Sequence, residues 1–170
     1  MTTDLLEMRV AVVTHDPNTN RPVLILKNEE AGKILPIWIG PYEADAITIK
    51  LQSVEVARPL THDLLEQSVR KLGAKVSHVV VNDLHDDTFY ARIVVDQDGQ
   101  RIELDSRPSD AIALAVRVQS PIFVSESVME RAGVVPDEEI DLDALTPEEE
   151  EKLAPYKDFI DGLDLGDLGE

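Results

Sequence analysis

Three strand-like stretches joined by very short polar turns constrain the fold of this chain more than any other feature. Residues 75–83, 88–95 and 101–105 carry β-branched residues in strand-like runs. The segments between them, His85-Asp86-Asp87 and Asp96-Gln97-Asp98-Gly99, are short and typical of turns. Because connections this short join antiparallel neighbours, the sequence predicts two consecutive β-hairpins.

Runs of strands and runs of helices alternate along the rest of the chain. Apolar stretches predict four more strands, at residues 6–14, 23–27, 33–39 and 121–124. Helical spacing predicts four helices, which begin at Pro41, at Thr61 as N-cap, at Pro108 and at Ser125 as N-cap. The helix after Pro108 is apolar almost all round and should be the most buried. This order favours an α+β fold, a single compact domain with a largely antiparallel mixed sheet and helices packed on it.

Pro36 places one predicted strand at an edge of the sheet. Proline has no backbone N–H to donate to a neighbouring strand, so residues 33–39 are expected to lie at an edge or to carry a bulge. Trp38 follows in the same apolar stretch and offers an anchor for a partner. We therefore expect a homodimer that uses this edge.

Negative charge is concentrated at the end of the chain. The net charge is −18, and residues 137–170 contain 14 acidic residues and two lysines, which leaves −6 for residues 1–136. We expect one domain at residues 1–135, followed by an acidic C-terminal extension at residues 136–170 that is partly helical from Thr146 or disordered. A field of this sign repels nucleic acid, but it does not forbid a local basic patch or a metal-assisted site.

Several classes of protein are excluded by what the sequence lacks. The chain has no cysteine, so it has no disulfides, no thiolate catalysis and no cysteine-ligated metal. No stretch approaches the roughly 20 apolar residues of a membrane span, and residues 1–4 show no signal sequence, so we expect a cytoplasmic protein that does not enter a membrane. Glycine-rich phosphate loops, nucleophile elbows and a basic stripe interleaved with aromatic residues are also absent.

The densest candidate chemistry lies at residues 105–110. Asp105 ends a strand, the chain turns through Ser106, Arg107 and Pro108, and Asp110 lies in the first turn of a helix. Asp105 and Asp110 are the residue types that hold Mg²⁺ or Mn²⁺, while Arg107 and the free N–H groups of the helix suit a phosphate. In the alternative interpretation, Asp110 only favours the helix dipole and Arg107 pairs with an acid for stability.

Two further groups of residues lie at predicted helix starts. His62 and Asp63 offer an imidazole as general base or metal ligand with a carboxylate to assist it. The alternative is an exposed His62 and an Asp63 that merely stabilises the first turn. Glu43 and Asp45 are two residues apart on a helix, so they face different directions and at most one of them serves a given site.

Several ordered blocks of this chain resemble the bifunctional nuclease domain family. The resemblance covers roughly residues 6–135, and the acidic extension lies outside it. The blocks are residues 35–40, 43–44, 46–47, 58–64, 83–84, 88–91, 105–115 and 121–124. The resemblance implies a compact α+β domain, a homodimer, and nuclease activity on DNA and RNA of the kind described for plant members. Its motif positions here are His62, Asp63, Asp105, Arg107, Ser109 and Asp110.

The leading functional hypothesis is therefore a metal-assisted nuclease that hydrolyses phosphodiester bonds in DNA, RNA or both. Asp105 and Asp110 would hold Mg²⁺ or Mn²⁺, and His62 or Asp63 would assist proton transfer. Arg107 would stabilise charge on the phosphate. Two alternatives stay open. One is a non-enzymatic dimeric binding or regulatory module, and the other is a hydrolase for a small phosphorylated substrate.

Overall fold

The computed structural model describes residues 4–136, which contain seven strands and four helices. The strands are β1 (Leu5–His15), β2 (Pro22–Lys27), β3 (Ile34–Trp38), β4 (Ala74–His85), β5 (Thr88–Gln97), β6 (Gln100–Ser106) and β7 (Ile122–Ser125). The helices are α1 (Pro41–Leu51), α2 (Thr61–Lys71), α3 (Pro108–Val118) and α4 (Glu126–Ala132). The element order agrees with the predicted α+β fold.

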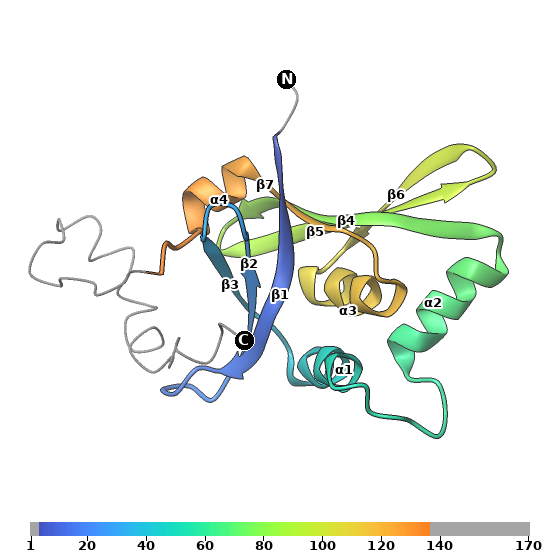
Figure 1. The fold of residues 1–170 in the computed structure, drawn as a ribbon, viewed down its shortest axis with the longest axis horizontal. Helices are drawn as coiled ribbons and strands as arrows, with labels where there is room; N and C mark the ends of the chain where they lie inside the picture. Colours follow the sequence, from blue (N-terminus) through green and yellow to red (C-terminus); the bar gives the residue numbers. More distant parts are fainter. Residues whose placement is uncertain (1–3, 137–170) are drawn as a thin grey trace, which may run out of the picture.

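One mixed sheet contains every described strand, in the order β3-β2-β1-β7-β4-β5-β6 (Figure 1). The first three strands form one antiparallel meander, and β4, β5 and β6 form a second. Strand β7 joins the two meanders, because it pairs antiparallel with β1 and parallel with β4. The two predicted hairpins and the largely antiparallel mixed sheet are confirmed.

The two edges of the sheet differ in how open they are. Strand β3 is an edge, as Pro36 predicted, and Pro36 lies opposite Ile25 of β2. Part of this edge is covered, since Ile34 exchanges two backbone hydrogen bonds with Val134. Strand β6 is the other edge and pairs only with β5 among the described strands.

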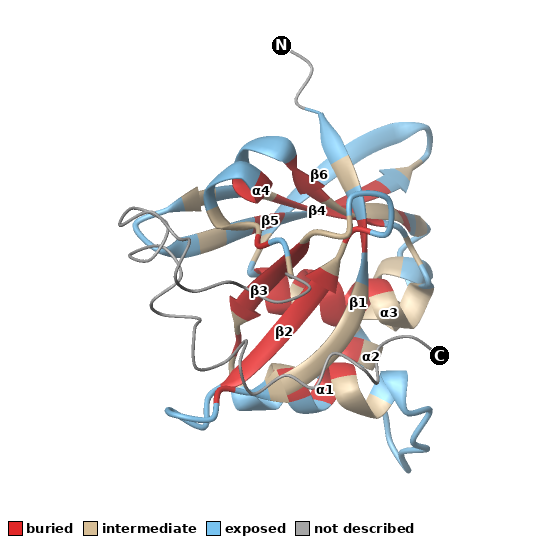
Figure 2. Ribbon diagram, turned by 60° about the vertical axis from the view of Figure 1, so that its left-hand side comes forward, coloured by how far each residue is buried: buried red, intermediate tan, exposed pale blue. Residues whose placement is uncertain are grey.

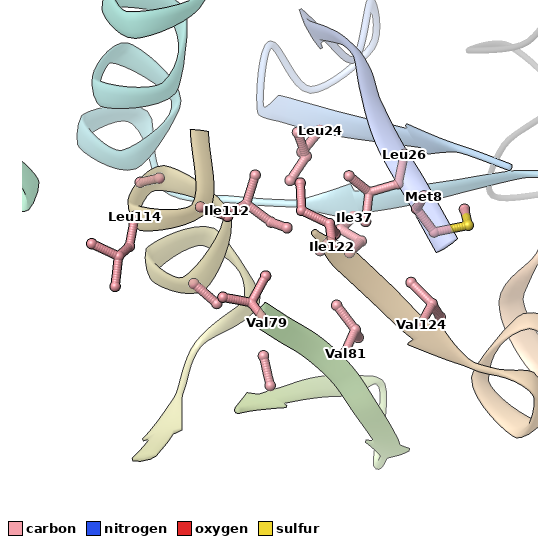
Figure 3. Packing of buried hydrophobic residues seen from close by; sticks show 14 of the residues in the cluster. Met8, Leu24, Leu26, Ile37, Val79, Val81, Ile112, Leu114, Ile122 and Val124 are labelled. Atoms are coloured by element: carbon pink, nitrogen blue, oxygen red, sulfur yellow. The ribbon is translucent and has the colours of Figure 1, made fainter. Parts of the chain in front are cut away.

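The core lies where helices α1, α2 and α3 cover one side of the sheet (Figures 1 and 2). Five consecutive residues of α3, Ala111, Ile112, Ala113, Leu114 and Ala115, are at most 1% exposed, which confirms the predicted burial of this helix. Figure 3 shows Ile112 and Leu114 beside Val79, with side chains of β1, β2, β3 and β7 completing the cluster. Because α3 is fixed on every side, its N-terminal end is a rigid platform for functional groups.

The start of α2 corrects one prediction. Thr61 is the first helical residue and Leu60 is the N-cap. The reason is Asp63, whose Oδ2 accepts a hydrogen bond from the backbone N–H of Leu60 at 2.8 Å. With Leu60 as N-cap, Asp63 stands at the third helical position, where its carboxylate satisfies the N–H of the N-cap residue.

Two expectations concern the membrane and the acidic extension. Among residues 4–136, no helix is long and apolar enough to cross a membrane. The predicted helix that begins at Thr146 lies outside the described residues, as do residues 137–170 of the acidic extension.

Candidate functional site

Helices α1 and α3 begin at one shared pocket. Each has a proline at its first position, Pro41 and Pro108, and neither has a side chain that caps its free N–H groups. The N-caps, Gly40 and Arg107, line the same cavity, which has a volume of about 450 Å³. The positive ends of two helix dipoles therefore border one pocket, an arrangement that favours an anion.

Arg107 is fixed at this pocket by two carboxylates. Its Nε donates to Asp110 Oδ2 at 2.8 Å, and its Nη2 donates to Glu43 Oε1 at 2.7 Å. Hydrogen bonds to Asp110 and then to Glu43 raise the pKa of Arg107 above its usual value. Nη1 donates no hydrogen bond to any residue in the described part of the chain, and the side chain is 63% exposed. The guanidinium thus has a fixed orientation and one end ready for a ligand.

His62 reaches the same cluster from α2. Its Nε2 lies 2.9 Å from Asp110 Oδ1, and the residue is 8% exposed. Burial alone would raise the pKa of Asp110, but the hydrogen bonds from Arg107 and His62 outweigh it and lower that pKa. Asp110 is therefore a charged bridge between an exposed guanidinium and a buried imidazole.

The structure brings three of the predicted site residues together, namely His62, Arg107 and Asp110. Glu43 joins them, so one member of the Glu43 and Asp45 pair faces the cluster. Asp45 is exposed on α1. The prediction that at most one of these two acids serves a site agrees with this arrangement.

Asp63 faces a different set of groups. Its Oδ1 accepts a hydrogen bond from Arg117 Nε at 2.7 Å, and the Arg117 side chain is only 4% exposed. Arg117 also donates to the carbonyls of Ala113 and Ala46, so this ion pair ties α1, α2 and α3 together. Burial of the Asp63 carboxyl is outweighed by the Leu60 N–H and by Arg117, and its pKa is lowered.

Asp105 and Ser109 occupy contrasting positions. Asp105 is exposed on β6 opposite Arg92 of β5, and it makes no hydrogen bond or ion pair with a described residue. Ser109 is 5% exposed and lines the pocket, and its hydroxyl makes no hydrogen bond within the described part of the chain. Ser109 therefore lines the pocket that Arg107 borders, and Asp105 does not.

The acidic residues of the cluster do not form a ready metal site. In residues 4–136, no group of three or more His, Asp or Glu side chains is arranged to hold a metal ion. Both carboxylate oxygens of Asp110 accept hydrogen bonds, from His62 and from Arg107. The guanidinium of Arg107 occupies the place between Glu43 and Asp110 that a bridging cation would need. Binding of Mg²⁺ or Mn²⁺ by Asp105 and Asp110 stays a prediction.

Sequence reasoning missed Arg117 and gave Glu43 no specific partner. A basic residue in the last turn of an apolar helix is an ordinary feature, and nothing local identifies Asp63, 54 residues away, as its partner. Glu43 is likewise 64 residues from Arg107. The signal in the sequence was Arg117 itself, because an arginine that becomes buried needs an acidic partner.

The sequence profile of the bifunctional nuclease domain matches residues 24–137, well over half of the chain. This chain belongs to the bifunctional nuclease domain family. An uncharacterized protein of Mycobacterium tuberculosis is 39% identical over 162 residues, which is 95% of this chain and 97% of the relative. The pocket and the cluster around Arg107 lie within the matched domain, apart from Arg21 and Pro22 at the pocket wall.

Plant relatives carry the family name. Bifunctional nuclease 1 of Arabidopsis thaliana is 31% identical over 109 residues, which is 62% of this chain and 34% of the plant protein. Bifunctional nuclease 2 of Oryza sativa subsp. japonica is 28% identical over 118 residues, 67% of this chain and 36% of the relative. The similarity to these plant proteins thus spans about a third of their length.

Proposed function

We propose that this chain is a nuclease that hydrolyses phosphodiester bonds in DNA, RNA or both at the cluster around Arg107. The observation that carries the proposal is the position of Arg107, held by Glu43 and Asp110 with Nη1 uncommitted at the mouth of a pocket. A guanidinium held in this way binds a phosphate without first losing its own conformational freedom. Membership of the bifunctional nuclease domain family and the names of the plant relatives support a phosphodiester as the substrate.

The residues of the cluster suit distinct steps of this reaction. Arg107 and the N–H groups of α1 and α3 would bind the scissile phosphate and stabilise the charge that develops on it. The imidazole of His62 is buried and does not line the pocket, so it would assist proton transfer through Asp110, to which its Nε2 is bound. Ser109 would donate a hydrogen bond to a phosphate oxygen. Asp63 would stabilise the start of α2, the helix that carries His62, through its ion pair with Arg117 and would take no part in the reaction itself.

The proposal includes a requirement for Mg²⁺ or Mn²⁺, but it gives the ion no ligands among the described residues and no step of its own. When bound, such an ion would supply Lewis-acid stabilisation of the phosphate. The side chains that the structure describes form no ready site for it, so the steps above use only the protein's own groups.

Cleavage of short oligonucleotides by nuclease-free protein tests the function. We expect Arg107→Ala to lower kcat/KM by about 100-fold or more, the scale set by loss of a group that stabilises developing charge. Arg92→Ala is the matched control, because Arg92 is an exposed arginine paired with Glu103 on the neighbouring strand. Equal rates for the wild-type protein and Arg107→Ala would overturn the proposal. Parallel reactions with EDTA, Mg²⁺ and Mn²⁺ test the metal requirement.

The same assay separates the alternatives. A hydrolase for small phosphorylated substrates would cleave mononucleotides or cyclic nucleotides and leave oligonucleotides intact. A non-enzymatic dimeric binding or regulatory module would bind without turnover under every metal condition. The net charge of −18 favours this last alternative, because it weakens long-range attraction of nucleic acid.

We also propose that the protein is a homodimer, and that its interface is the β6 edge. Self-pairing of β6 about Glu103 would place Arg101 opposite the partner's Asp105 and Ile102 opposite the partner's Leu104. Ile102 and Leu104 are 37% and 39% exposed, so this pairing would bury apolar surface on both copies. Our expectation from Pro36 pointed to β3, but Val134 covers part of that edge, which makes β6 the more open one.

A further inference from the structure

The pocket between the N-terminal ends of α1 and α3 has an aromatic wall as well as a cationic one. Trp38, at the end of β3, and Phe89, near the start of β5, both line it. Each is half-buried, with one part of its surface packed on a hydrophobic cluster. The sequence showed no stripe of basic residues interleaved with aromatic ones, because these two residues come from strands far apart in the chain.

The Trp38 side chain is held in place by Asp16. The Asp16 carboxylate accepts hydrogen bonds from the backbone of Asn18 and Thr19, and its pKa is lowered by the Asn18 bond first. A further hydrogen bond from the Trp38 side chain lowers the same pKa. The indole is therefore an oriented surface, and a base that stacks on it does not have to order it first.

The same pocket is lined by groups that bind phosphate. Arg107 lines it and has its Nη1 uncommitted, and Ser109 adds a hydroxyl that makes no hydrogen bond with a described residue. Arg21 lies on the same lining, is exposed, and forms no ion pair within residues 4–136. The N-terminal ends of two 11-residue helices border the pocket as well.

Size decides which form of nucleic acid fits. A volume of about 450 Å³ is within the range of small-molecule sites and is far too small for a duplex. The net charge of −18 opposes the long-range attraction of single strands and duplexes alike. Affinity must then come from short-range contacts, and stacking on an aromatic ring requires a base whose face is exposed.

We propose that this pocket binds one unstacked nucleotide, with its phosphate at Arg107, Ser109 and Arg21 and its base against Trp38. The inference rests on the proposed function in that it names the form of the substrate, a single strand or a free nucleotide in place of a duplex. Phe89 also lines the pocket.

Trp38 provides the experiment, because it is the only tryptophan in the chain. The full-length protein is titrated with a short phosphorothioate oligothymidylate, which resists cleavage, and with its annealed duplex, thymidine monophosphate and inorganic phosphate. We expect saturable quenching of Trp38 fluorescence by the single strand and little by the duplex. Comparison of the oligonucleotide with the mononucleotide distinguishes a strand from a free nucleotide as the source of the bound group.

Variants then locate the contacts. With a labelled single strand and anisotropy as readout, Trp38→Leu should weaken binding by about 5- to 150-fold, the factor that one base–aromatic stack contributes. Arg21→Ala and Ser109→Ala leave the indole in place and should weaken binding while retaining the quenching signal at saturation. Arg70→Ala, which removes one exposed positive charge from α2, is the matched control and should bind as the wild-type protein does.

The outcomes separate this inference from the proposed function. Binding that depends on Trp38 and Arg21, without cleavage of an ordinary oligonucleotide, supports the inference and counts against the nuclease. Cleavage that is unaffected by Trp38→Leu and Arg21→Ala overturns the inference and leaves the nuclease standing. Equal affinity for the single strand and the duplex also overturns the inference.

Discussion

His62 Nε2 lies 2.9 Å from Asp110 Oδ1, and this contact joins the first turn of α2 to the first turn of α3. The imidazole is buried, whereas the carboxylate also accepts hydrogen bonds from the exposed Arg107. Asp110 therefore couples the interior of the domain to the pocket surface. A change at Asp110 should alter both the stability of the fold and the orientation of Arg107.

Asp110→Asn tests this coupling through its pH dependence. We expect the substitution to lower the free energy of unfolding by about 1–3 kcal/mol near pH 7, because it weakens charge-assisted hydrogen bonds. The pKa of Asp110 is lowered in the folded protein relative to 3.8 in the unfolded chain, so the ionised carboxylate stabilises the fold fully above that value. This contribution is lost as the pH falls through the folded-state pKa.

The difference between the wild-type protein and Asp110→Asn should therefore be present above about pH 5 and should shrink below about pH 4. Urea unfolding followed by circular dichroism at several pH values measures it. Asp45→Asn, an exposed change in α1, should stay within about 0.5 kcal/mol of the wild-type protein. A difference that does not vary with pH would contradict the assignment of the ionised form.

The ion pair between Asp63 and Arg117 should contribute to stability and not to nuclease activity. Removal of the Asp63 charge leaves the nearly buried guanidinium of Arg117 with carbonyl partners only, so we expect Asp63→Asn to cost about 3 kcal/mol of unfolding free energy. Below its unfolding temperature the variant should keep most of its nuclease activity, because Asp63 makes no contact with Arg107 or Asp110. Thermal unfolding and oligonucleotide cleavage measure the two effects separately. Normal stability with lost activity would instead give Asp63 a direct role in the reaction.

The sequence predicted the fold well because the fold depends on local patterns. Short polar turns imply hairpins, Pro36 implies an edge, and an all-round apolar helix implies burial. The contact between Arg107 and Asp110 could also be predicted, since Arg107 is the N-cap of α3 and Asp110 lies three residues later in its first turn. Local patterns do not encode the contacts of His62 with Asp110 or of Glu43 with Arg107, which join residues 48 and 64 positions apart. The sequence gives the residue types there, and only the packing of α1 and α2 against α3 brings them together.

The proposed dimer at the β6 edge can be tested by reversing the charge of Arg101. In the proposed dimer, Arg101→Asp would place a carboxylate opposite the partner's Asp105, and like charges directly opposite each other destabilise paired strands. We expect the wild-type protein to have a dimeric mass by light scattering at micromolar concentration and Arg101→Asp to shift toward the monomer. Within each chain Arg101 lies opposite Asp96 and Asp105 lies opposite Arg92, so the rescue variant combines Arg101→Asp and Asp105→Arg with Asp96→Arg and Arg92→Asp. It restores opposite charges across the interface and between β5 and β6, and it should restore the dimer.

Arg70→Asp, the same charge change on the exposed face of α2, is the control and should remain dimeric. A monomeric wild-type protein would contradict the proposed homodimer. A dimer that is insensitive to both β6 variants would place the interface elsewhere, with the β3 edge as the next surface to vary.

Gly40→Ala tests whether the orientation of Arg107 matters for function. A Cβ at residue 40 would meet the carboxylate of Glu43, so the end of the Glu43 side chain must shift and its hydrogen bond from Arg107 Nη2 is disturbed, which leaves Asp110 Oδ1 as the other acceptor of Nη2. The backbone of Gly40, with φ −72°, is open to alanine, so the fold should tolerate the change. We expect kcat/KM to fall by about 10- to 100-fold, the scale of a misplaced binding group, with binding of the phosphorothioate strand weakened as well.

Gly73→Ala is the control. A Cβ at residue 73 would meet no other atom, but the φ of +81° is unfavourable for alanine. The substitution should therefore cost about 1 kcal/mol of stability and leave binding and cleavage unchanged. If Gly40→Ala binds and cleaves like the wild-type protein, the orientation that Glu43 gives to Arg107 is not part of the site.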